Sequence, residues 1–186
     1  MMDEYVVGLF VGDGVAHRNK ANRSYGVWID QHVKNKDILE NLRMEFLKDN
    51  LKFYWYKVPD NKIRILLYSK EKYLIIKQAK EDASKFFRKL NNKQKKKFIG
   101  GFFDAEGTVT DRLVVYNKDK QLLEEIKKFL KTLGIISYIY KFSKVFGLQI
   151  YRKVHVQIFM KNIKSVKLSR VIQPDKKRSR LQIRKD

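Results

Sequence analysis

Residues 8–14 read Gly-Leu-Phe-Val-Gly-Asp-Gly, and residues 101–107 read Gly-Phe-Phe-Asp-Ala-Glu-Gly. A shift of 93 positions places Gly8 on Gly101, and it places the acid Asp13 on the acid Glu106. Each segment mixes small and large apolar residues and ends in a carboxylate followed by glycine. The two segments therefore indicate a duplicated unit with one acid in each half.

Around both segments, the spacing of apolar residues predicts the same order of helix, strand, helix, hairpin and helix. The first set is expected at helix 4–12, loop 15–23, strand 25–30, helix 37–47, strands 52–57 and 62–68, and helix 71–90. The second set is expected at helix 97–106, strand 113–116, helix 119–133, strands 137–143 and 148–158, and helix 161–169. We therefore expect repeats at 1–92 and 93–172, followed by a basic tail at 173–186.

The composition of the 186 residues favours a globular protein that binds a polyanion. Hydrophobic residues make up 44% of the chain, which is enough for a packed core. The 42 Lys and Arg residues outnumber the 20 Asp and Glu residues, so the net charge is +22, and a phosphate backbone suits such an excess best. The absence of cysteine excludes disulfides and thiolate metal sites. We see neither a signal-peptide pattern nor a membrane-spanning stretch, and we expect an intracellular protein with no membrane partner.

Small residues recur at helical spacing in both segments. Gly8 and Gly12 share one helix face, and Gly101 and Ala105 share the matching face. Glycine inside a helix costs about 0.5–1 kcal/mol relative to alanine, so several in a few turns need a reason. Small residues at this spacing let two helix backbones approach closely, and we expect the two helices to cross there.

Such a crossing would place Asp13 and Glu106 side by side at two helix C-termini. The helix dipole disfavours an anion there, and the two carboxylates also repel each other. A divalent cation removes both penalties, and an oxygen donor set with open positions suits magnesium. Taken alone, either segment is more often just a helix that meets a turn. Asp104 has no acidic counterpart in the first segment and is interpreted as a structural or capping residue.

With their flanks, residues 6–14 and 99–107 resemble the two motifs of the LAGLIDADG homing endonucleases, in the single-chain form with two repeats. The resemblance covers about residues 4–170. It implies an α+β fold of duplicated αββαββα units about a pseudo-two-fold axis, with a saddle of antiparallel β-sheets for DNA. It also implies a monomer that cleaves a specific double-stranded DNA site across the minor groove with two or more Mg²⁺ ions. Short 3′ overhangs and intron mobility belong to the same implication.

The resemblance also assigns site residues. Asp13 and Glu106 would bind metal together with the carbonyls of Gly12 and Ala105. Gln31 and Asn117 match the polar residues that stand near the scissile phosphates. A basic residue usually assists them, but the chain departs from the pattern here, and several cations are left as candidates without a firm assignment: His32, Lys34, Arg112, Lys118 and Lys120.

Alternating strands predict a DNA-reading surface. In 148–158, one face carries Gln149, Tyr151, Lys153, His155 and Gln157, and the other face is mostly apolar. Arg64 and Tyr68 share the outer face of 62–68. On 52–57, Lys52, Tyr54 and Tyr56 share a face whose exposure the pattern does not settle. A β-ribbon with such side chains fits the major groove of DNA.

Two other classes of protein share these features. An RNA maturase, with an intron RNA as partner, or a DNA-binding regulator would keep the fold and the charge without needing both acids. A structural ribosome-associated protein would explain the charge but not the duplication. The acid retained in each half favours cleavage over both.

Overall fold

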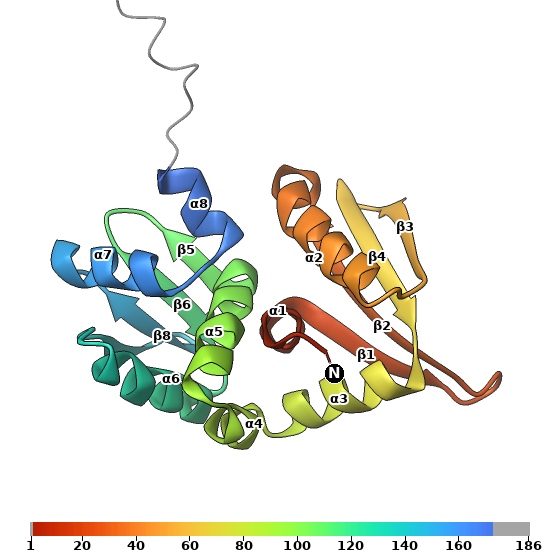
Figure 1. Cartoon of the computed structure of the whole chain (residues 1–186), viewed down its shortest axis with the longest axis horizontal. Coiled ribbons are helices and arrows are strands. Elements are labelled where there is room, and N and C mark those ends of the chain that lie inside the picture. The colour runs from red at the N-terminus through yellow and green to blue at the C-terminus, as the bar shows by residue number, and fades with distance from the viewer. Residues whose placement is uncertain (1, 173–186) are drawn as a thin grey trace, which may run out of the picture.

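The computed structural model describes residues 2–172, and the basic tail expected at 173–186 lies outside this range. The first half runs through α1 (Glu4–Asp13), β1 (Gly14–Asn19), β2 (Ser24–His32), the short 3₁₀ helix η1 (Val33–Asn35), α2 (Lys36–Lys48), β3 (Phe53–Val58), β4 (Lys62–Tyr68) and α3 (Lys70–Glu81). The helix α4 (Ala83–Lys89) follows. Figure 1 shows the two halves side by side, with α4 at their lower junction.

The second half repeats this order. It runs through α5 (Asn92–Glu106), β5 (Gly107–Val109), β6 (Leu113–Asn117), α6 (Lys120–Thr132), β7 (Tyr138–Phe142), β8 (Val145–Ile150), α7 (Lys153–Asn162) and α8 (Val166–Ile172). The antiparallel sheets have the matching strand orders β1-β2-β4-β3 and β5-β6-β8-β7. The expected α+β fold with duplicated αββαββα units is therefore confirmed. The repeat boundaries expected after residues 92 and 172 stay predictions.

Four elements differ from the sequence-based expectation. The helix expected at 161–169 is not continuous, because α7 ends at Asn162 and α8 begins only at Val166. The loop expected at 15–23 is wrong, because residues 14–19 form β1 and pair with β2 from Gly14↔Ile29 to Asn19↔Ser24. The helix expected over 71–90 is divided, because Asp82 ends α3 and its carboxylate caps α4 by accepting the Lys85 N–H. The strand expected over 148–158 ends at Ile150, and residues 153–162 form the helix α7 instead.

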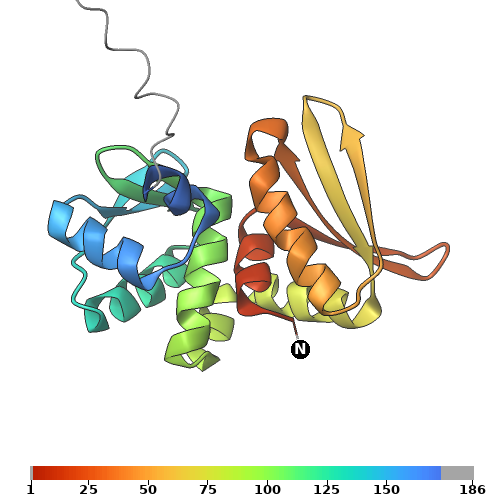
Figure 2. The ribbon, with the colours of Figure 1, turned by 45° about the horizontal axis from the view of Figure 1, so that its top comes forward.

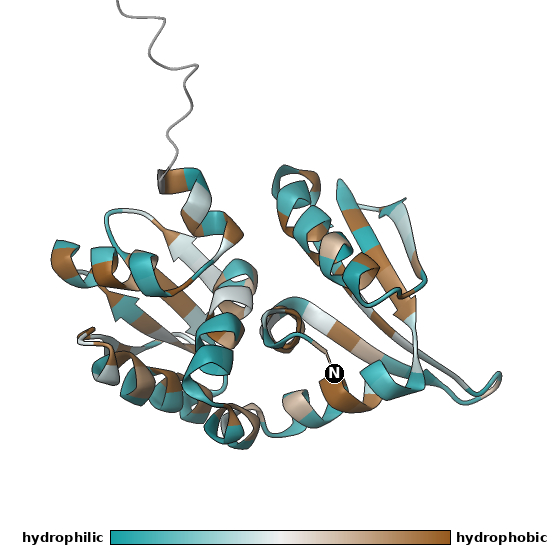
Figure 3. Cartoon of the chain, viewed as in Figure 1, coloured by the Kyte–Doolittle hydropathy of each residue, from teal (hydrophilic) through white to brown (hydrophobic). Residues whose placement is uncertain are grey.

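Each sheet buries one face under helices and leaves the other face open. In the second sheet, Leu113 and Leu148 are buried on the covered face, which Phe159 of α7 also contacts. Hydropathy alternates along the central strands accordingly (Figure 3). Among residues 2–172, no helix combines the length and apolar character needed to cross a bilayer.

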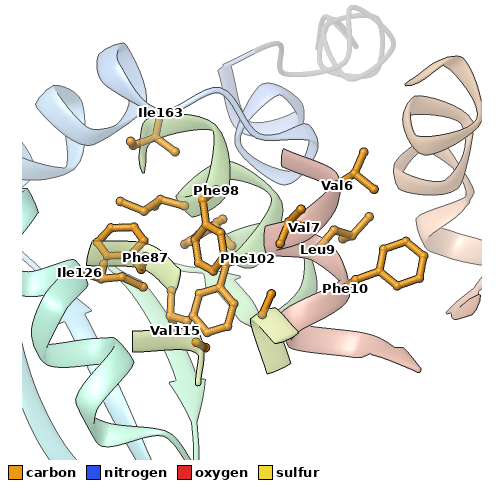
Figure 4. Close-up of a cluster of buried hydrophobic side chains, with 14 of the residues drawn as sticks. Val6, Val7, Leu9, Phe10, Phe87, Phe98, Phe102, Val115, Ile126 and Ile163 are labelled. Carbon is orange, nitrogen blue, oxygen red and sulfur yellow. The ribbon is translucent and has the colours of Figure 1, made fainter. Parts of the chain in front are cut away.

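Helices α1 and α5 lie against each other at the centre of the molecule (Figure 2). Their large apolar side chains point away from this contact, each into its own half. Phe98 and Phe102 lie beside Phe87 of α4 and Ile126 of α6, whereas Phe10 points the opposite way (Figure 4). The buried side chains of both halves join in one cluster, and the closest approach of the two helices is left to small residues.

Candidate active site at the helix crossing

The glycines of α1 and α5 allow their backbones to touch. A Cβ on Gly8 would lie 2.1 Å from the Phe98 carbonyl oxygen, and a Cβ on Gly101 would lie 1.9 Å from the Tyr5 carbonyl oxygen. Nearer the C-terminal ends, a Cβ on Gly12 would lie 2.4 Å from the Ala105 Cβ. The expected close crossing is therefore present, and it brings the final turns of both helices together.

Asp13 and Glu106 are the last residues of α1 and α5. The glycines that follow adopt extended rather than left-handed backbone, with φ −81° at Gly14 and φ −82° at Gly107. Glycine is needed there for space, because a Cβ on Gly14 would lie 2.3 Å from the Phe10 ring. A Cβ on Gly107 would lie 2.4 Å from the Phe103 carbonyl oxygen. The backbone therefore turns sharply after each acid and passes directly from α1 into β1 and from α5 into β5.

A side-chain amide holds each acid. Gln31 Nε2 donates to Asp13 Oδ2 at 2.6 Å, and Asn117 Nδ2 donates to Glu106 Oε1 at 3.0 Å. The Gln31 oxygen accepts from Asn35 Nδ2 at 3.2 Å, and the Asn117 oxygen accepts from the Asp119 N–H at 2.8 Å. Because each amide oxygen is occupied, each NH₂ group must face its carboxylate. The two halves thus use the same arrangement of acid, amide and support.

Two lysines that the sequence analysis missed complete the site. Lys80 of α3 donates from Nζ to the carbonyl oxygens of Phe10, Val11 and Gly14, at 3.0, 3.3 and 2.8 Å. Lys167 of α8 donates to those of Ala105 and Gly107, at 3.2 and 2.8 Å. Both lysines contact the carbonyl of the glycine that follows an acid. Each therefore places a positive charge at the end of a motif helix, where it suits the dipole.

The site shifts the pKa values of all four charged groups. Burial raises the pKa of the Asp13 and Glu106 carboxyls, and the negative charge of Asp13 raises that of Glu106 further. The amide hydrogen bonds and the two lysines act in the opposite direction on both acids. Burial lowers the pKa of Lys80 and Lys167, against the pull of the nearby acids. The site therefore brings two anions and two cations together, with Asp13 and Lys80 open to solvent and Glu106 and Lys167 half-buried.

Asp104 fixes the helix that carries Lys167. It is fully buried, and its carboxylate accepts hydrogen bonds from the N–H groups of Val166 and Lys167, both at 2.8 Å. It also accepts from Ser165 Oγ at 2.6 Å and from the Tyr5 hydroxyl at 2.8 Å. An acid in α5 thus caps α8 and links it to α1. The hydrogen bonds agree with the structural or capping interpretation of Asp104.

The basic residues proposed from the sequence lie elsewhere. The described hydrogen bonds link none of them to Asp13 or Glu106. Exposed His32 caps η1 by accepting the Lys34 N–H at 3.2 Å. Arg112 lies in the β5–β6 turn and pairs with Asp111 at 3.0 Å. Lys118 and Lys34 are exposed, and the Lys120 ammonium lies over the Phe146 ring.

The residues predicted to read DNA on the first sheet do share its open face. By strand register, Arg64 and Tyr68 of β4 lie on one face with Tyr54 and Tyr56 of β3, which settles the exposure left open for β3. Arg64 donates to both carboxylate oxygens of Asp30 at 2.7 Å. A guanidinium held in this way is pre-positioned, and it must share its charge with Asp30.

The prediction for the second sheet is partly wrong. Gln149 lies opposite Val114 and Tyr138 on the open face, and Tyr151 packs against the Tyr138 ring just beyond β8. The remaining predicted DNA contacts, at Lys153, His155 and Gln157, lie on α7. That helix packs on the covered side of the sheet through Phe159, which contacts Phe103. These three side chains therefore do not extend the β-surface.

Known proteins resemble this chain in sequence and in fold. The homing endonuclease I-DmoI of Desulfurococcus mucosus is 34% identical over 146 residues, which are 73% of this chain and 72% of that protein. The chain belongs to the LAGLIDADG homing endonuclease family. The LAGLIDADG-like domain model matches residues 93–164 of this family member. Its α+β fold and its duplicated motifs are thus those of a DNA endonuclease family.

Two further matches agree with the family assignment. The uncharacterized protein MJ0398 of Methanocaldococcus jannaschii is 30% identical over 141 residues, or 73% of this chain, and the LAGLIDADG chain spans about 50% of its length. The crystal structure of I-DmoI in complex with DNA and Mn has a TM-score of 0.69 at 26% identity, and the match covers 87% of this chain and 95% of that one.

Proposed function

We propose that this chain is a site-specific endonuclease that cuts both strands of a double-stranded DNA target by metal-dependent hydrolysis. The observation that carries the proposal is the doubled set of acid, amide and lysine at the α1–α5 crossing. One set per half gives one hydrolytic centre per DNA strand. Cleavage across the minor groove with short 3′ overhangs, action as a monomer and support of intron mobility complete the proposal.

The donor atoms fit a divalent cation. Within residues 2–172, no three His, Cys, Asp or Glu side chains gather as a metal site, so the candidate donors are two carboxylates and backbone carbonyls. Hard oxygen donors with open positions suit Mg²⁺. A cation near Asp13 and Glu106 would offset the burial that raises both pKa values and the repulsion from Asp13 that raises the pKa of Glu106 further. Crystal structures show I-DmoI in complex with DNA and Mn or Ca, and a variant of it with target DNA in the presence of Mg.

Asp13 and Glu106 would hold the cations, with the Gly12 and Ala105 carbonyls as further ligands. When bound, such ions lower the pKa of water and neutralise charge on a leaving oxygen. The Ala105 carbonyl already accepts from Lys167, so any cation there shares this oxygen with the lysine. Gln31 and Asn117 keep each carboxylate in one orientation. Lys80 and Lys167 place fixed positive charge where a phosphate gains negative charge during hydrolysis.

The test needs the target site first. Cleavage of the intron-free allele at the insertion locus, or selection of cut sites from a randomised duplex library, supplies it. The Asp13→Asn and Glu106→Gln variants are then compared with the wild type in Mg²⁺ and in Ca²⁺. We expect double-strand cuts by the wild type in Mg²⁺, binding without cutting in Ca²⁺, and loss of cutting in both variants.

A matched control removes an acid elsewhere. Asp49→Asn takes one negative charge from the exposed end of α2, and it should cut like the wild type. Normal cutting of both strands by either Asp13→Asn or Glu106→Gln would refute the assignment of the site.

A second candidate function is binding of an intron RNA by the same scaffold. The open faces of the sheets favour it, because they carry rings on which unpaired bases stack. The first sheet presents Trp28, Tyr54, Tyr56 and Tyr68, and the second sheet presents Tyr116, Tyr138 and Tyr140. Splicing of the intron by the Asp13→Asn variant, with no cleavage of DNA by the wild type, would move this function to first place.

A further inference from the structure

The positive charge of this protein is not concentrated on its sheets. The eight strands that the structure describes contain five basic residues, Arg18, Lys57, Lys62, Arg64 and Lys141, and the acid Asp30. Residues 83–103 alone contain seven basic residues and no acid. They span α4 and most of α5, and the seven are Lys85, Arg88, Lys89, Lys93, Lys95, Lys96 and Lys97.

Four of these cations, Lys85, Arg88, Lys89 and Lys93, form an exposed group that we call the α4–α5 surface. Lys85, Arg88 and Lys89 are spaced three and four residues apart, so they share one face of α4. The opposite face is buried through Phe87, which packs edge-on against Phe98 of α5. The contact holds α4 against α5, and Lys93 is exposed in the first turn of α5, four residues after Lys89.

The other three cations have partners inside the protein. Lys97 pairs with Asp3 at 2.5 Å, Lys96 donates to Asn162 at 2.8 Å, and the Lys95 ammonium lies over the Phe87 and Phe129 rings. No ion pair within residues 2–172 involves the four cations of the α4–α5 surface. Their bordering acids are Asp82, which caps α4, and Glu124 and Glu125 of α6, which line a groove with Arg88. Lys128 neutralises Glu125.

This surface is remote from the candidate active site. Lys93 and Glu106 lie near opposite ends of α5, and 13 residues at 1.5 Å each separate them by about 20 Å along the axis. Figure 2 shows α4 and the start of α5 at the lower end of the crossing, whereas α5 ends at its upper side. A duplex that lies over Asp13 and Glu106 therefore leaves the four cations free.

We propose that the α4–α5 surface binds the phosphate backbone of a second DNA duplex without sequence preference. One monomer then holds two DNA segments, its target on the sheets and a second segment at α4. Like charges gathered without acid partners repel one another, and phosphates relieve that repulsion while releasing counterions. The N–H groups at the start of α5 are already engaged by the Asn91–Gln94 capping box, so the lysine and arginine side chains are the contacts. Binding of the target on the sheets rests on the proposed function, whereas binding of the second segment at α4 does not.

The test is a bridging experiment with the full chain. Two duplexes of about 30 base pairs and unrelated sequence, one with a donor dye and one with an acceptor, are mixed with protein at about 50 mM salt. We expect energy transfer and two duplexes per monomer, with sedimentation showing a single protein chain per complex. The variant Lys85→Gln/Arg88→Gln/Lys89→Gln/Lys93→Gln should bind one duplex and lose the transfer. In the wild type, log affinity for the second duplex should fall with log salt at a slope of about 3–4, as expected for four cations on phosphates.

The control variant removes four other cations that have no ion pair in the described part of the chain: Lys127→Gln/Lys131→Gln/Lys161→Gln/Lys164→Gln. It lowers the net charge equally and should still bridge. Equal loss of bridging in both variants would show an effect of net charge alone and would overturn the proposal. Bridging that persists in the α4–α5 variant, or competition by an RNA hairpin but not by DNA, would overturn it too.

Cleavage separates this inference from the proposed function. The α4–α5 variant should cut its target at the wild-type rate when the target is short and isolated. Cutting without bridging in the wild type would refute only the second surface. Bridging without cutting in the wild type would refute only the endonuclease.

Discussion

The glycine contact between α1 and α5 is open to a direct test with Gly101→Ala. The new Cβ would lie 1.9 Å from the Tyr5 carbonyl oxygen and 2.8 Å from the Leu9 nitrogen. Cβ atoms essentially never approach closer than 3.0 Å, so the two backbones must separate by about 1.1 Å. Both neighbours are backbone atoms of a helix, so no side-chain rotation relieves the clash.

The expected size of the effect follows from two opposing contributions. Overpacking of a tight contact costs about 1–3 kcal/mol, and the rigid backbone on both sides favours the upper end. Alanine returns about 1 kcal/mol through its better helix propensity. We expect a net loss of about 2 kcal/mol, which for a chain of this size lowers Tm by about 4–8 °C. Because the same movement displaces Glu106 from Asp13 by about 1 Å, cleavage should fall by about 100-fold.

Calorimetry and a cleavage time course measure the two effects. The matched control is Gly26→Ala in β2, where the new Cβ would meet Leu66 and Tyr68 at an ordinary 3.5 Å. That variant should be as stable as the wild type or slightly more stable, since alanine costs less entropy than glycine in a strand. The reasoning is refuted if Gly101→Ala melts and cuts like Gly26→Ala.

Three further predictions follow from the site. Burial raises the pKa values of the Asp13 and Glu106 carboxyls in the folded chain. The stability that these groups contribute is therefore full below their pKa values in the unfolded chain, and it is lost as pH rises through their pKa values in the folded chain. Without divalent cations, Asp13→Asn and Glu106→Gln should unfold at higher denaturant concentration than the wild type at pH 7 but not at pH 3. Lys80→Met and Lys167→Met should each lower kcat by about 100-fold or more with little change in DNA affinity. The control variant Lys77→Met, on the exposed side of α3, should cut at the wild-type rate. Equal cleavage rates in all three variants would contradict the role of the site lysines. Asp104→Asn weakens the cap of α8 and should lower the free energy of unfolding by about 3 kcal/mol. The specific readout is faster hydrogen exchange at the Val166 and Lys167 amides. Unchanged exchange at these amides would show that other contacts hold α8.

Some features of the site could be predicted because the information is local. Glycines four residues apart predicted the crossing, and the acid at each motif end followed from it. The matching amides, Gln31 and Asn117, were found through the family resemblance, which places polar residues near the end of the strand that follows each motif. The structure adds that Gln31 and Asn117 are oriented by Asn35 and Asp119, which no pattern in the sequence specifies.

The lysines were missed because they lie far from the acids along the chain. Lys80 and Lys167 follow Gln31 and Asn117 by 49 and 50 positions, so the duplication itself contained a signal that the motif shift of 93 did not reveal. In a chain with 42 basic residues, no local feature distinguishes these two. Only the folding of α3 and α8 against the motif helices brings their ammonium groups to the carbonyls.

The error at 148–158 has a similar origin. Residues 153–158 alternate between polar and apolar side chains, but Val156, Phe159 and Ile163 also recur at helical spacing. Short segments that fit both periods are decided by their packing partners. Here Phe103 and the covered face of the second sheet receive Phe159, and the segment becomes α7.

The sequence by itself determined the duplication, the crossing of two glycine-containing helices and the acid at the end of each, because these depend on residue types within a few turns of one chain segment. The tertiary structure alone decided which cations face the acids, which face of β3 is open, and that four cations of α4 and α5 make no ion pair within residues 2–172. Those properties depend on contacts between residues far apart in sequence, and such contacts exist only once the two halves have packed.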